Sequence, residues 1–551
     1  MKRTNLFFLL LMATIQLSAQ LCLNGVPLPY DKLTNTFLAS VPESDFSKGN
    51  KFSMTSVEPN LQVYFTHQPN NDGNMFVFSD ISEGKSYSLQ LRRKNQVILS
   101  ANLQFTFLPI LQLQGDFGYD YQPGTLLLYE PNKASIDTLQ STIKWRGGIT
   151  NTDDKHKRNY KIKLNNDKSL LGMRNDNNWI LDAGQADVFR LRNRVAMDIW
   201  NDIATPPYYI DREPNAHSGV KGKLVEVFLN DQYMGFYNFS ENMDRKQMKV
   251  KKVDKETGLI RGCLYKAKQW EYALMYDTLY IPADNLSEQW NAFEVKYPDL
   301  TDNDTTDWST LYNAIDFVVM SSDLEFADHV AEYFDIPPLV DYCVFGSSLN
   351  ALDNYGKNIY WAVYDKNEDK RLTLGAWDLD CTVGQPWAAR YNVEFTSPYL
   401  LFDMSFGLTR RLITLNVDNF NEKVNQRYKE LRTNILSNQA LKQRYHDYYD
   451  IIVSSGAANR ETLRWSRDSD IDFEPIDFSY EMDNIDRWIT THMNLLDRHE
   501  FPISIDISGI GNQPTVNTEK TNSVYDLSGR RLNGKSLSKG IYIINGRKVV
   551  K

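Results

Sequence analysis

The sequence has little of what marks several common classes of protein. Its 551 residues include only 4 cysteines (Cys22, Cys263, Cys343 and Cys381), too few and too scattered for a disulfide framework or a zinc site. With 61 basic against 70 acidic residues, the net charge of −9 argues against a nucleic-acid partner held by bulk charge. HExxH, GxSxG and GxGxxG motifs are all absent. These absences exclude disulfide scaffolds and common zinc and serine hydrolases.

Long apolar runs are also missing after the first 19 residues, so no transmembrane segment is expected in the mature chain. Residues 1–19 combine Lys2 and Arg3 with an apolar run and the small residues Ser18 and Ala19. This is the pattern of a secretory signal peptide. A membrane helix needs about 20 apolar residues, more than this run supplies. The sequence therefore predicts export through the inner membrane.

The other end of the chain predicts a small β module. Residues 523–527 and 540–544 alternate like strands, each followed by a turn signal, and residues 547–551 would return as a basic final strand. Residues 502–520 contain the Gly, Asn, Thr and Pro of a linker. The segments YDLSGRR and KGIYI resemble the C-terminal sorting domain of the type IX secretion system of certain Gram-negative bacteria. That resemblance implies that residues 521–551 contact the secretion machinery, and that the body is secreted or attached to the outer cell surface.

Between the two ends the pattern changes once. Residues 20–108 alternate in short runs separated by turn signals, which predicts a β-sandwich acting as a spacer or adhesion module. Residues 109–501 begin with strand patterns and a hairpin over 224–239, and end in helices. A helix is expected over 187–203 and a strand pair over 358–380, with later helices over 419–436, 440–454 and 483–499. The expected fold class is α+β, with a β-leaning lobe, a helical lobe and a cleft between them.

The segment with the most chemical information runs from residue 349 to residue 384. Asp353 is followed five residues later by Asn358, the spacing of catalytic base and metal-binding Asn in a protein kinase catalytic loop. Asp378 and Asp380 are two apart on a predicted strand, so both would face one way and share hard cations such as Mg²⁺. The same residue types also serve as turn formers, helix caps and calcium ligands.

Basic residues that could hold phosphate precede this segment. Lys161 and Lys163 share one face of a predicted strand, and one of them could contact the α- and β-phosphates of a nucleotide. A solvated edge strand would explain either lysine equally well. Arg146 precedes a Gly-Gly turn that lets backbone amides approach phosphate. Glu241 could pair with a lysine or a nucleotide, whereas Arg192 could form a buried ion pair with Asp187.

Ordered blocks over residues 135–500 resemble the spore coat protein H (CotH) kinase family. They include IKWRGGIT, KRNYKIKL, VEVFLNDQYMGFYNFSENMD, GCLYKAKQW and GAWDLDCTVG. The resemblance implies a two-lobed atypical kinase that uses ATP and Mg²⁺ or Mn²⁺ to phosphorylate Ser or Thr of a protein substrate.

The family pattern also implies a role for each matching residue. Asp353 matches the catalytic base and Asn358 a metal ligand, and either Asp378 or Asp380, with Asp378 preferred, matches the main metal ligand. The phosphate-holding lysine is Lys163 or Lys161, with Lys163 preferred, and Arg146, Glu241, Arg192 and Lys266 lie in the recurring blocks.

The chain departs from ordinary kinases at two points. Ala351 and Leu352 replace the usual His-Arg before the catalytic Asp, and no Gly directly follows the second carboxylate motif. A non-catalytic surface adhesion or binding protein on the same scaffold is therefore the alternative function. A glycosidase with paired carboxylates is a third, favoured by the high aromatic content of 13%.

Overall fold

The computed structural model describes residues 21–46, 50–66, 70–72, 74–78, 81, 84–269, 284–385, 407–466, 476–502, 524–525, 541–544 and 547–550. The chain forms two compact units, Met1–Ile503 and Ser504–Lys551. The predicted signal peptide and most of the predicted linker and sorting module lie outside the described residues. Among the described residues, no helix has both the length and the apolarity needed to cross a membrane.

The first strands form two five-stranded sheets around a shared core of alternating apolar residues, as a β-sandwich requires. One sheet has the order β2-β1-β5-β8-β7 and the other β3-β4-β10-β9-β6. The first sheet contains β1 (Leu21–Leu23), β2 (Val26–Pro27), β5 (Asn50–Ser56), β7 (Asn70–Asp72) and β8 (Met75–Phe78). The second contains β3 (Tyr30–Asp31), β4 (Thr36–Ser40), β6 (Gln62–Phe65), β9 (Tyr87–Arg93) and β10 (Gln96–Thr106). A short 3₁₀ turn, Glu43–Asp45, follows β4.

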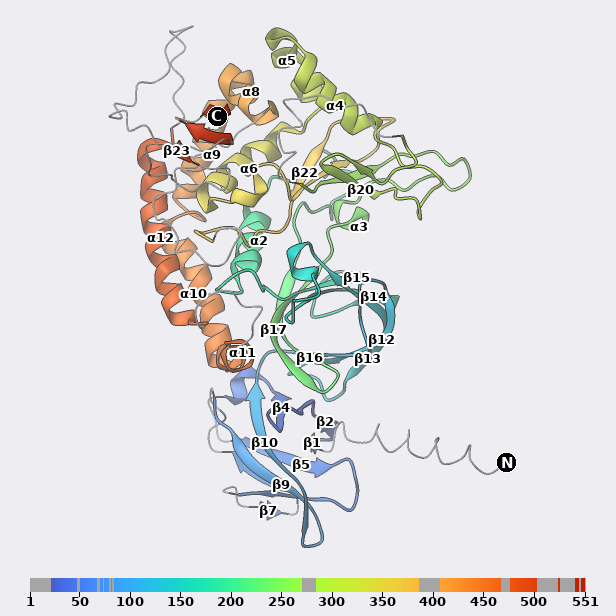
Figure 1. The fold of residues 1–551 in the computed structure, drawn as a ribbon, viewed down its shortest axis with the longest axis vertical. Coiled ribbons are helices and arrows are strands. Elements are labelled where there is room, and N and C mark those ends of the chain that lie inside the picture. The colour runs from blue at the N-terminus through green and yellow to red at the C-terminus, as the bar shows by residue number, and fades with distance from the viewer. Residues whose placement is uncertain are drawn as a thin grey trace. The chain divides into compact units, whose positions relative to one another are not determined.

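The next strands close into a seven-stranded barrel in the order β11-β12-β13-β14-β15-β17-β16, which appears as a ring in Figure 1. Closure leaves no free sheet edge. The strands are β11 (Ile110–Gln114), β12 (Gln122–Tyr129), β13 (Asp137–Arg146), β14 (Asn159–Ser169), β15 (Asn175–Asp182), β16 (Gly222–Leu229) and β17 (Gln232–Glu241). The predicted hairpin over 224–239 is confirmed as β16 and β17, paired from Gly222–Ser240 to Leu229–Gln232.

Another five-stranded sheet, here called the β18–β22 sheet, and a set of helices follow the barrel. The sheet has the order β19-β20-β18-β21-β22 and contains β18 (Cys263–Ala267), β19 (Gln289–Trp290), β20 (Phe293–Tyr297), β21 (Ile359–Val363) and β22 (Thr373–Ala376). Helix α2 (Arg192–Ile203) lies between β15 and β16 in the sequence, and the helices that follow the barrel strands include α3 (Arg245–Met248), α4 (Ser309–Met320), α5 (Asp323–His329), α6 (Ile336–Leu349) and α8 (Gly407–Leu415). Short 3₁₀ turns lie at Ile149–Asn151, Val330–Glu332, Leu352–Asn354 and Val417–Asn419. Strands β21 and β22 confirm the strand pair predicted over 358–380.

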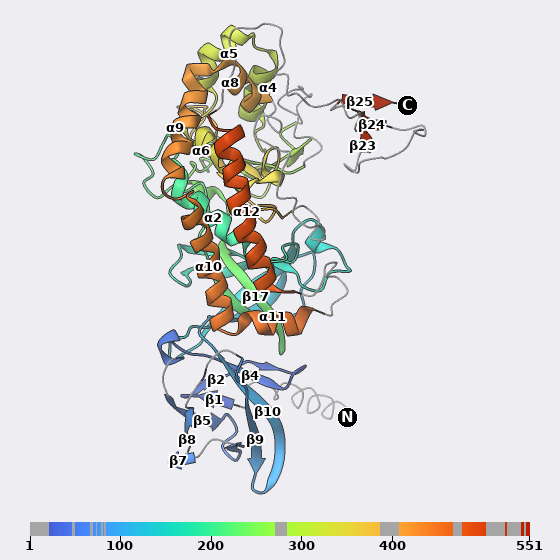
Figure 2. The ribbon, with the colours of Figure 1, turned by 90° about the vertical axis from the view of Figure 1, so that its left-hand side faces the viewer.

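The last helices return to the barrel. They are α9 (Phe420–Arg432), α10 (Asn438–Ser454), α11 (Ala457–Trp465) and α12 (Phe478–His499), which confirm the three helices predicted in this region and add α11. Figure 2 shows α10 and α12 side by side, with α11 beside β17. Arg460 of α11 donates to the buried carboxylate of Glu226 in β16, at 2.8 Å from Nε, and to the carbonyl of Phe105 at 3.5 Å. Helix α11 therefore joins the sandwich to the barrel.

Mixed helix and sheet confirm the predicted α+β class, whereas the kinase-like two-lobed arrangement and the boundaries at residues 108 and 501 stay predictions. The sandwich and barrel share a small apolar cluster that includes Leu38, Ile110 and Phe228. In the second unit, β23 (Val524–Tyr525), β24 (Ile541–Ile544) and β25 (Arg547–Val550) form an antiparallel sheet. These strands coincide with the predicted β module, and a role in sorting stays a prediction.

Candidate active site

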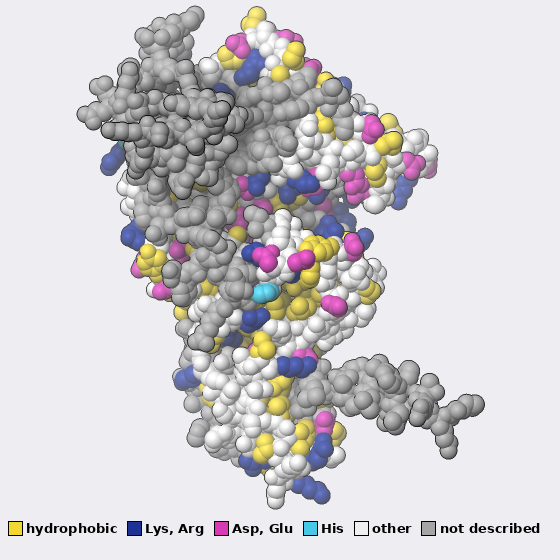
Figure 3. Space-filling view, viewed as in Figure 1, with side chains coloured by type: hydrophobic (Ala, Val, Ile, Leu, Met, Phe, Trp, Pro, Cys, Tyr) yellow, Lys and Arg dark blue, Asp and Glu magenta, His cyan; other side chains and the backbone are white. Residues whose placement is uncertain are grey.

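A polar cavity of about 620 Å³ lies between the barrel and the β18–β22 sheet. Its wall combines residues of β13, β14 and β15 with residues of β18 and β20 and of the loops around β21 and β22. In Figure 3, basic and acidic side chains gather in the hollow above the barrel. The cavity therefore brings the strand-rich first part of the predicted domain against the segment between residues 349 and 384.

Asp353 and Asn358 both line this cavity and contact each other. Asn358 Nδ2 donates to Asp353 Oδ2 at 2.9 Å, and Lys357 Nζ lies 2.9 Å from the same oxygen. Burial alone would lower the pKa of Lys357, but the carboxylate of Asp353 outweighs it and raises that pKa. The carboxylate of Asp353 is thus held in one orientation by an amide and an ammonium group.

Asp378 and Asp380 both line the cavity, but the prediction that they lie on a strand is wrong. Strand β22 ends at Ala376, and Asp378 takes the left-handed conformation with φ 57°. Both carboxylates nevertheless reach the same space through the turn. Burial, followed by the neighbouring Asp378 and Asp182 carboxylates, raises the pKa of Asp380 well above its usual range.

Asp182, at the end of β15, is a further carboxylate of the cavity that the sequence interpretation missed. Its Oδ2 accepts from Asn193 Nδ2 at 2.7 Å, and its Oδ1 accepts from the backbone N–H of Gly184 at 3.0 Å. Burial, with Asp378 nearby, raises the pKa of Asp182. Its position directly after an apolar strand run and before Gly184 was the signal available in the sequence.

Basic side chains form another part of the wall. Lys161 of β14 and Lys266 of β18 are half-buried and line the cavity, as does Arg146, whose guanidinium lies 5.4 Å from the ring centre of Trp377. Burial, with Lys296, Arg146 and Lys144 nearby, lowers the pKa of Lys161 to about 8. Burial likewise lowers the pKa of Lys266 to about 8, although Asp378 opposes the shift. Two lysines without a paired carboxylate among the described residues are a site for an anion.

Lys163, the preferred lysine, lies outside the cavity lining. Its side chain is exposed on β14, two residues after Lys161, at a position along the strand that lies beyond the cavity. The shared strand face was predicted correctly, but the position of the cavity along that face depends on β18 and β20. The structure therefore places Lys161 and not Lys163 at the cavity.

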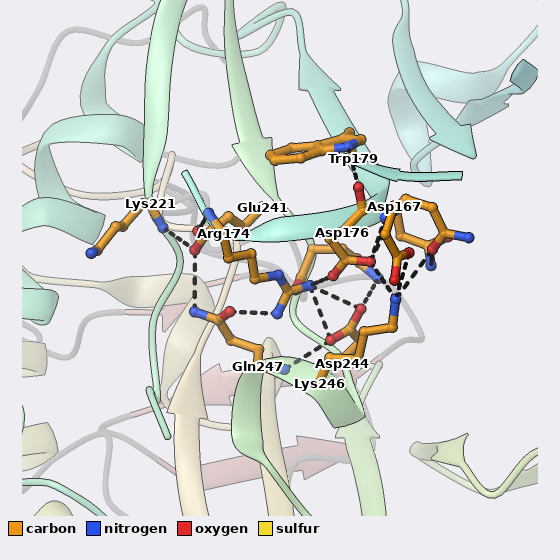
Figure 4. Close-up of polar contacts among 12 residues, drawn as sticks. Asp167, Arg174, Asp176, Trp179, Lys221, Glu241, Asp244, Lys246 and Gln247 are labelled. Carbon is orange, nitrogen blue, oxygen red and sulfur yellow. Dashed lines mark hydrogen bonds and ion pairs between the residues drawn. The ribbon is translucent and has the colours of Figure 1, made fainter. Parts of the chain in front are cut away.

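Glu241 also lies outside the cavity lining. Figure 4 shows its carboxylate turned toward Arg174, Lys221 and Gln247. It accepts the backbone N–H of Arg174 at 3.1 Å and that of Lys221 at 3.0 Å. Its contacts join three chain segments, and the predicted contact with a nucleotide does not fit this position.

The predicted ion pair of Arg192 is confirmed. Arg192 Nη1 lies 2.7 Å from Asp187 Oδ1, both side chains are buried, and the guanidinium also pairs with Glu481 of α12. The helix predicted from residue 187 begins at Arg192, because Asp187 belongs to the preceding turn and accepts the backbone N–H of Arg192 at 2.8 Å.

Several other charged residues of the cavity were not identified from the sequence. The signal for Lys357 was its place between Asp353 and Asn358, whereas the others come from strands with no motif of their own. The cavity lining also includes Lys144, Lys268, Glu294, Lys296 and Lys357. Lys296 pairs with Glu294 at 2.7 Å, so part of this charge is already neutralised.

The donor set suits a hard cation. Among the described residues no three His, Cys, Asp or Glu side chains lie close enough to hold a metal ion by themselves. Mg²⁺, however, is bound through one or two carboxylates plus phosphate oxygens and water. Asp378 and Asp380 supply such a pair in the cavity that Asn358 also lines, and a cation would relieve the repulsion between their negative charges. The residues present therefore fit the metal ion that a kinase uses.

Comparison with known proteins identifies a family for this chain. The profile of the family described as CotH kinase protein matches residues 143–496, more than half of the chain. No curated protein matches the chain. The match begins in β13 and ends in α12, so it includes all of the residues that line the cavity except Tyr119. The chain belongs to the CotH kinase protein family.

Proposed function

We propose that this protein is an exported atypical protein kinase that transfers the γ-phosphoryl group of ATP to Ser or Thr of a protein, with Mg²⁺ or Mn²⁺. Membership of the CotH kinase family supports phosphoryl transfer as the reaction class. One observation carries the proposal to this cavity: it is lined by the Asp353–Asn358 pair, by the Asp378–Asp380 pair, and by Lys161 and Lys266, which form no ion pair with any residue that the structure describes.

The basic wall would bind the triphosphate. Lys161 and Lys266 come from different sheets and reach the same cavity, so they can contact different phosphate groups of one chain. Arg146 adds a planar donor beside them. A nucleotide triphosphate carries negative charge that would pair with these ammonium groups, and binding it would favour their charged form further.

The acidic wall would hold the metal ion. Asp378 and Asp380 are the proposed ligands, with the side-chain oxygen of Asn358 as a further one. When bound, Mg²⁺ neutralises charge on the phosphate oxygens and fixes their orientation. Asp182 lies beside this pair and adds negative charge on the barrel side.

Asp353 is the proposed base. In the transfer it would accept the proton of the acceptor hydroxyl, while that oxygen forms a bond to the γ-phosphorus and the bond to the β–γ bridging oxygen breaks, releasing ADP. Asn358 holds one carboxylate oxygen of Asp353 in place. Lys357, at 2.9 Å from the same oxygen, adds positive charge where the phosphoryl group passes.

The location and partners are part of the same proposal. The N-terminal pattern of residues 1–19 supports export, and the resemblance of residues 521–551 to a type IX sorting domain supports a secreted or surface-attached form. A protein at the cell surface is the proposed substrate or partner.

The experiment uses γ-labelled ATP with Mg²⁺ or Mn²⁺ and compares the purified wild-type chain with Asp353→Ala and Asp378→Ala. The proposal expects label on the protein or on a generic substrate, lost in both variants. A ligand at about 100 times its Kd should also stabilise the fold by about 2.7 kcal/mol. Absence of both label and thermal stabilisation by ATP would favour a non-catalytic binding protein, and label that survives both substitutions would contradict the assigned site.

A further inference from the structure

Asn193, in the first turn of α2, connects the end of β15 to the loop that carries Asp378 and Asp380. Its Nδ2 donates to Asp182 Oδ2 at 2.7 Å, and its Oδ1 accepts the backbone N–H of Leu379 at 3.0 Å. Both ends of one side-chain amide are thus used. The amide cannot rotate without losing both hydrogen bonds, because its donor and acceptor would exchange places.

The bond to Leu379 acts at the centre of the carboxylate pair. Leu379 lies between Asp378 and Asp380, and its own side chain is fully buried. Because Asp378 has a left-handed backbone, the loop turns sharply just before this N–H. Fixing the Leu379 amide therefore fixes the direction in which both neighbouring carboxylates leave the chain.

The rest of the loop is held from the same helix. Arg192, next to Asn193, contacts the carbonyl of Val383 through Nε at 3.4 Å. Inside the loop, Thr382 Oγ1 donates to the carbonyl of Leu379 at 2.8 Å. The first turn of α2 thus holds the loop at two points, and Asn193 is the one adjacent to the carboxylates.

We propose that Asn193 is a positioning residue for the divalent cation site, aiming Asp378 and Asp380 into the cavity with Asp182 as the anchor of its amide. This inference rests on the proposed function. Partners that orient metal ligands are generally worth about 10- to 100-fold in metal affinity. We therefore expect Asn193→Leu, which keeps the branching and the number of heavy atoms and removes both hydrogen bonds, to weaken cation binding by roughly 10- to 100-fold.

The test measures Mn²⁺ binding to the full chain by electron paramagnetic resonance, with and without ATP, alongside melting temperature and phosphoryl transfer. Asn201→Leu is the matched control, because Asn201 lies on the same helix and donates to the carbonyl of Val220 at 3.0 Å, away from Leu379. Asn193→Leu should lose Mn²⁺ affinity, while Asn201→Leu should keep it.

A reciprocal exchange keeps the test decisive if Asn193→Leu fails to fold. Asn193→Asp retains the acceptor for Leu379 but puts two carboxylates face to face, and Asp182→Asn removes the acceptor for the Asn193 amide. The double variant restores one amide and one carboxylate with their positions exchanged, and residue 182 can still accept the N–H of Gly184. Each single variant should bind Mn²⁺ more weakly than the double variant.

The outcomes separate this inference from the proposed function. Wild-type protein that binds neither Mn²⁺ nor ATP and transfers no label would overturn the proposed function itself. Wild-type protein that binds Mn²⁺, with Asn193→Leu binding it within about twofold, would overturn only the role of Asn193. A double variant no better than the weaker single variant would overturn the Asn193–Asp182 pairing.

Discussion

Strand β15 runs between two charged clusters that differ in one respect. At its start, Arg174 lies 2.5 Å from Asp176 and 3.0 Å from Asp244, and Lys246 pairs with Asp176 at 2.7 Å (Figure 4). At its other end, Asp182 faces a cavity where Lys161 and Lys266 have no ion pair among the residues that the structure describes. The first cluster neutralises itself, and the second leaves both signs of charge exposed to one space.

The difference separates charges that stabilise the fold from charges available to a ligand. In the cluster of Figure 4, burial acts to raise the pKa of Asp176, but Lys246 and Arg174 together outweigh burial and lower that pKa. In the cavity, burial lowers the pKa of Lys161 and Lys266 and raises that of Asp380. Groups held away from their ordinary pKa in a cavity are candidates for function. The experiments below test this contrast.

The largest effect is expected for Asp353. Asp353→Asn removes the proposed base and should lower the rate of phosphoryl transfer by about 10²- to 10⁴-fold, the usual contribution of general base catalysis. Single-turnover transfer of γ-label measures this rate. Unchanged MgATP affinity would show that the cavity is intact, whereas an unchanged rate would contradict the assignment of the base.

The next effect compares two lysines on one strand face. Lys161→Met removes a charged donor from the cavity, and since hydrogen bonds to charged groups contribute about 1.5–3 kcal/mol, ATP affinity should fall by roughly tenfold or more. Lys163→Met is the matched control, because Lys163 is exposed outside the cavity lining. Titration calorimetry with ATP measures both. Equal losses of ATP affinity in the two variants would contradict the assignment of Lys161, and not Lys163, to the nucleotide site.

A third change acts on the self-neutralised cluster. Glu241→Gln turns one buried acceptor oxygen into a donor that faces a backbone N–H, of either Arg174 or Lys221. An unsatisfied buried group costs about 1–3 kcal/mol, so the free energy of unfolding should fall by about that amount. Urea denaturation measures it. ATP affinity of the folded protein should stay the same. A loss of ATP binding without a loss of stability would show that Glu241 belongs to the nucleotide site after all.

The smallest effect is a pH dependence of nucleotide binding. Lys161 and Lys266, with pKa lowered to about 8, lose their charge as pH rises through 8, whereas a bound triphosphate favours the charged form. ATP affinity should therefore fall on the order of fivefold between about pH 7.5 and 9, and binding near pH 8.5 should take up protons. Calorimetry in two buffers of different ionisation enthalpy measures the uptake. In Lys161→Met the dependence should become weaker.

Local patterns predicted the elements better than the contacts between them. The hairpin β16–β17 and helices α9, α10 and α12 follow from periodicity and turn residues. The spacing of Asp353 and Asn358 singled out their loop, but the hydrogen bond between the two side chains was not predicted. The choice of Lys161 over Lys163 did not follow, because it depends on where β18 and β20 cross the barrel. Glu241 has the sequence context of a site residue but is bound by Arg174, Lys221 and Gln247, which no local pattern connects to it.

The contact between Arg460 and Glu226 has a consequence for biosynthesis. The two residues are 234 positions apart, and Glu226 is fully buried inside the barrel wall. When β16 leaves the ribosome, the guanidinium that will neutralise its carboxylate has not yet been made. Until α11 has been synthesised, the barrel strands lack the stabilisation that Arg460 gives to Glu226. Leaving one partner of a buried ion pair without the other costs about 3–5 kcal/mol. Nascent chains stopped before residue 460 should be open to proteases in β16 and β17, and chains that extend past α11 should resist them.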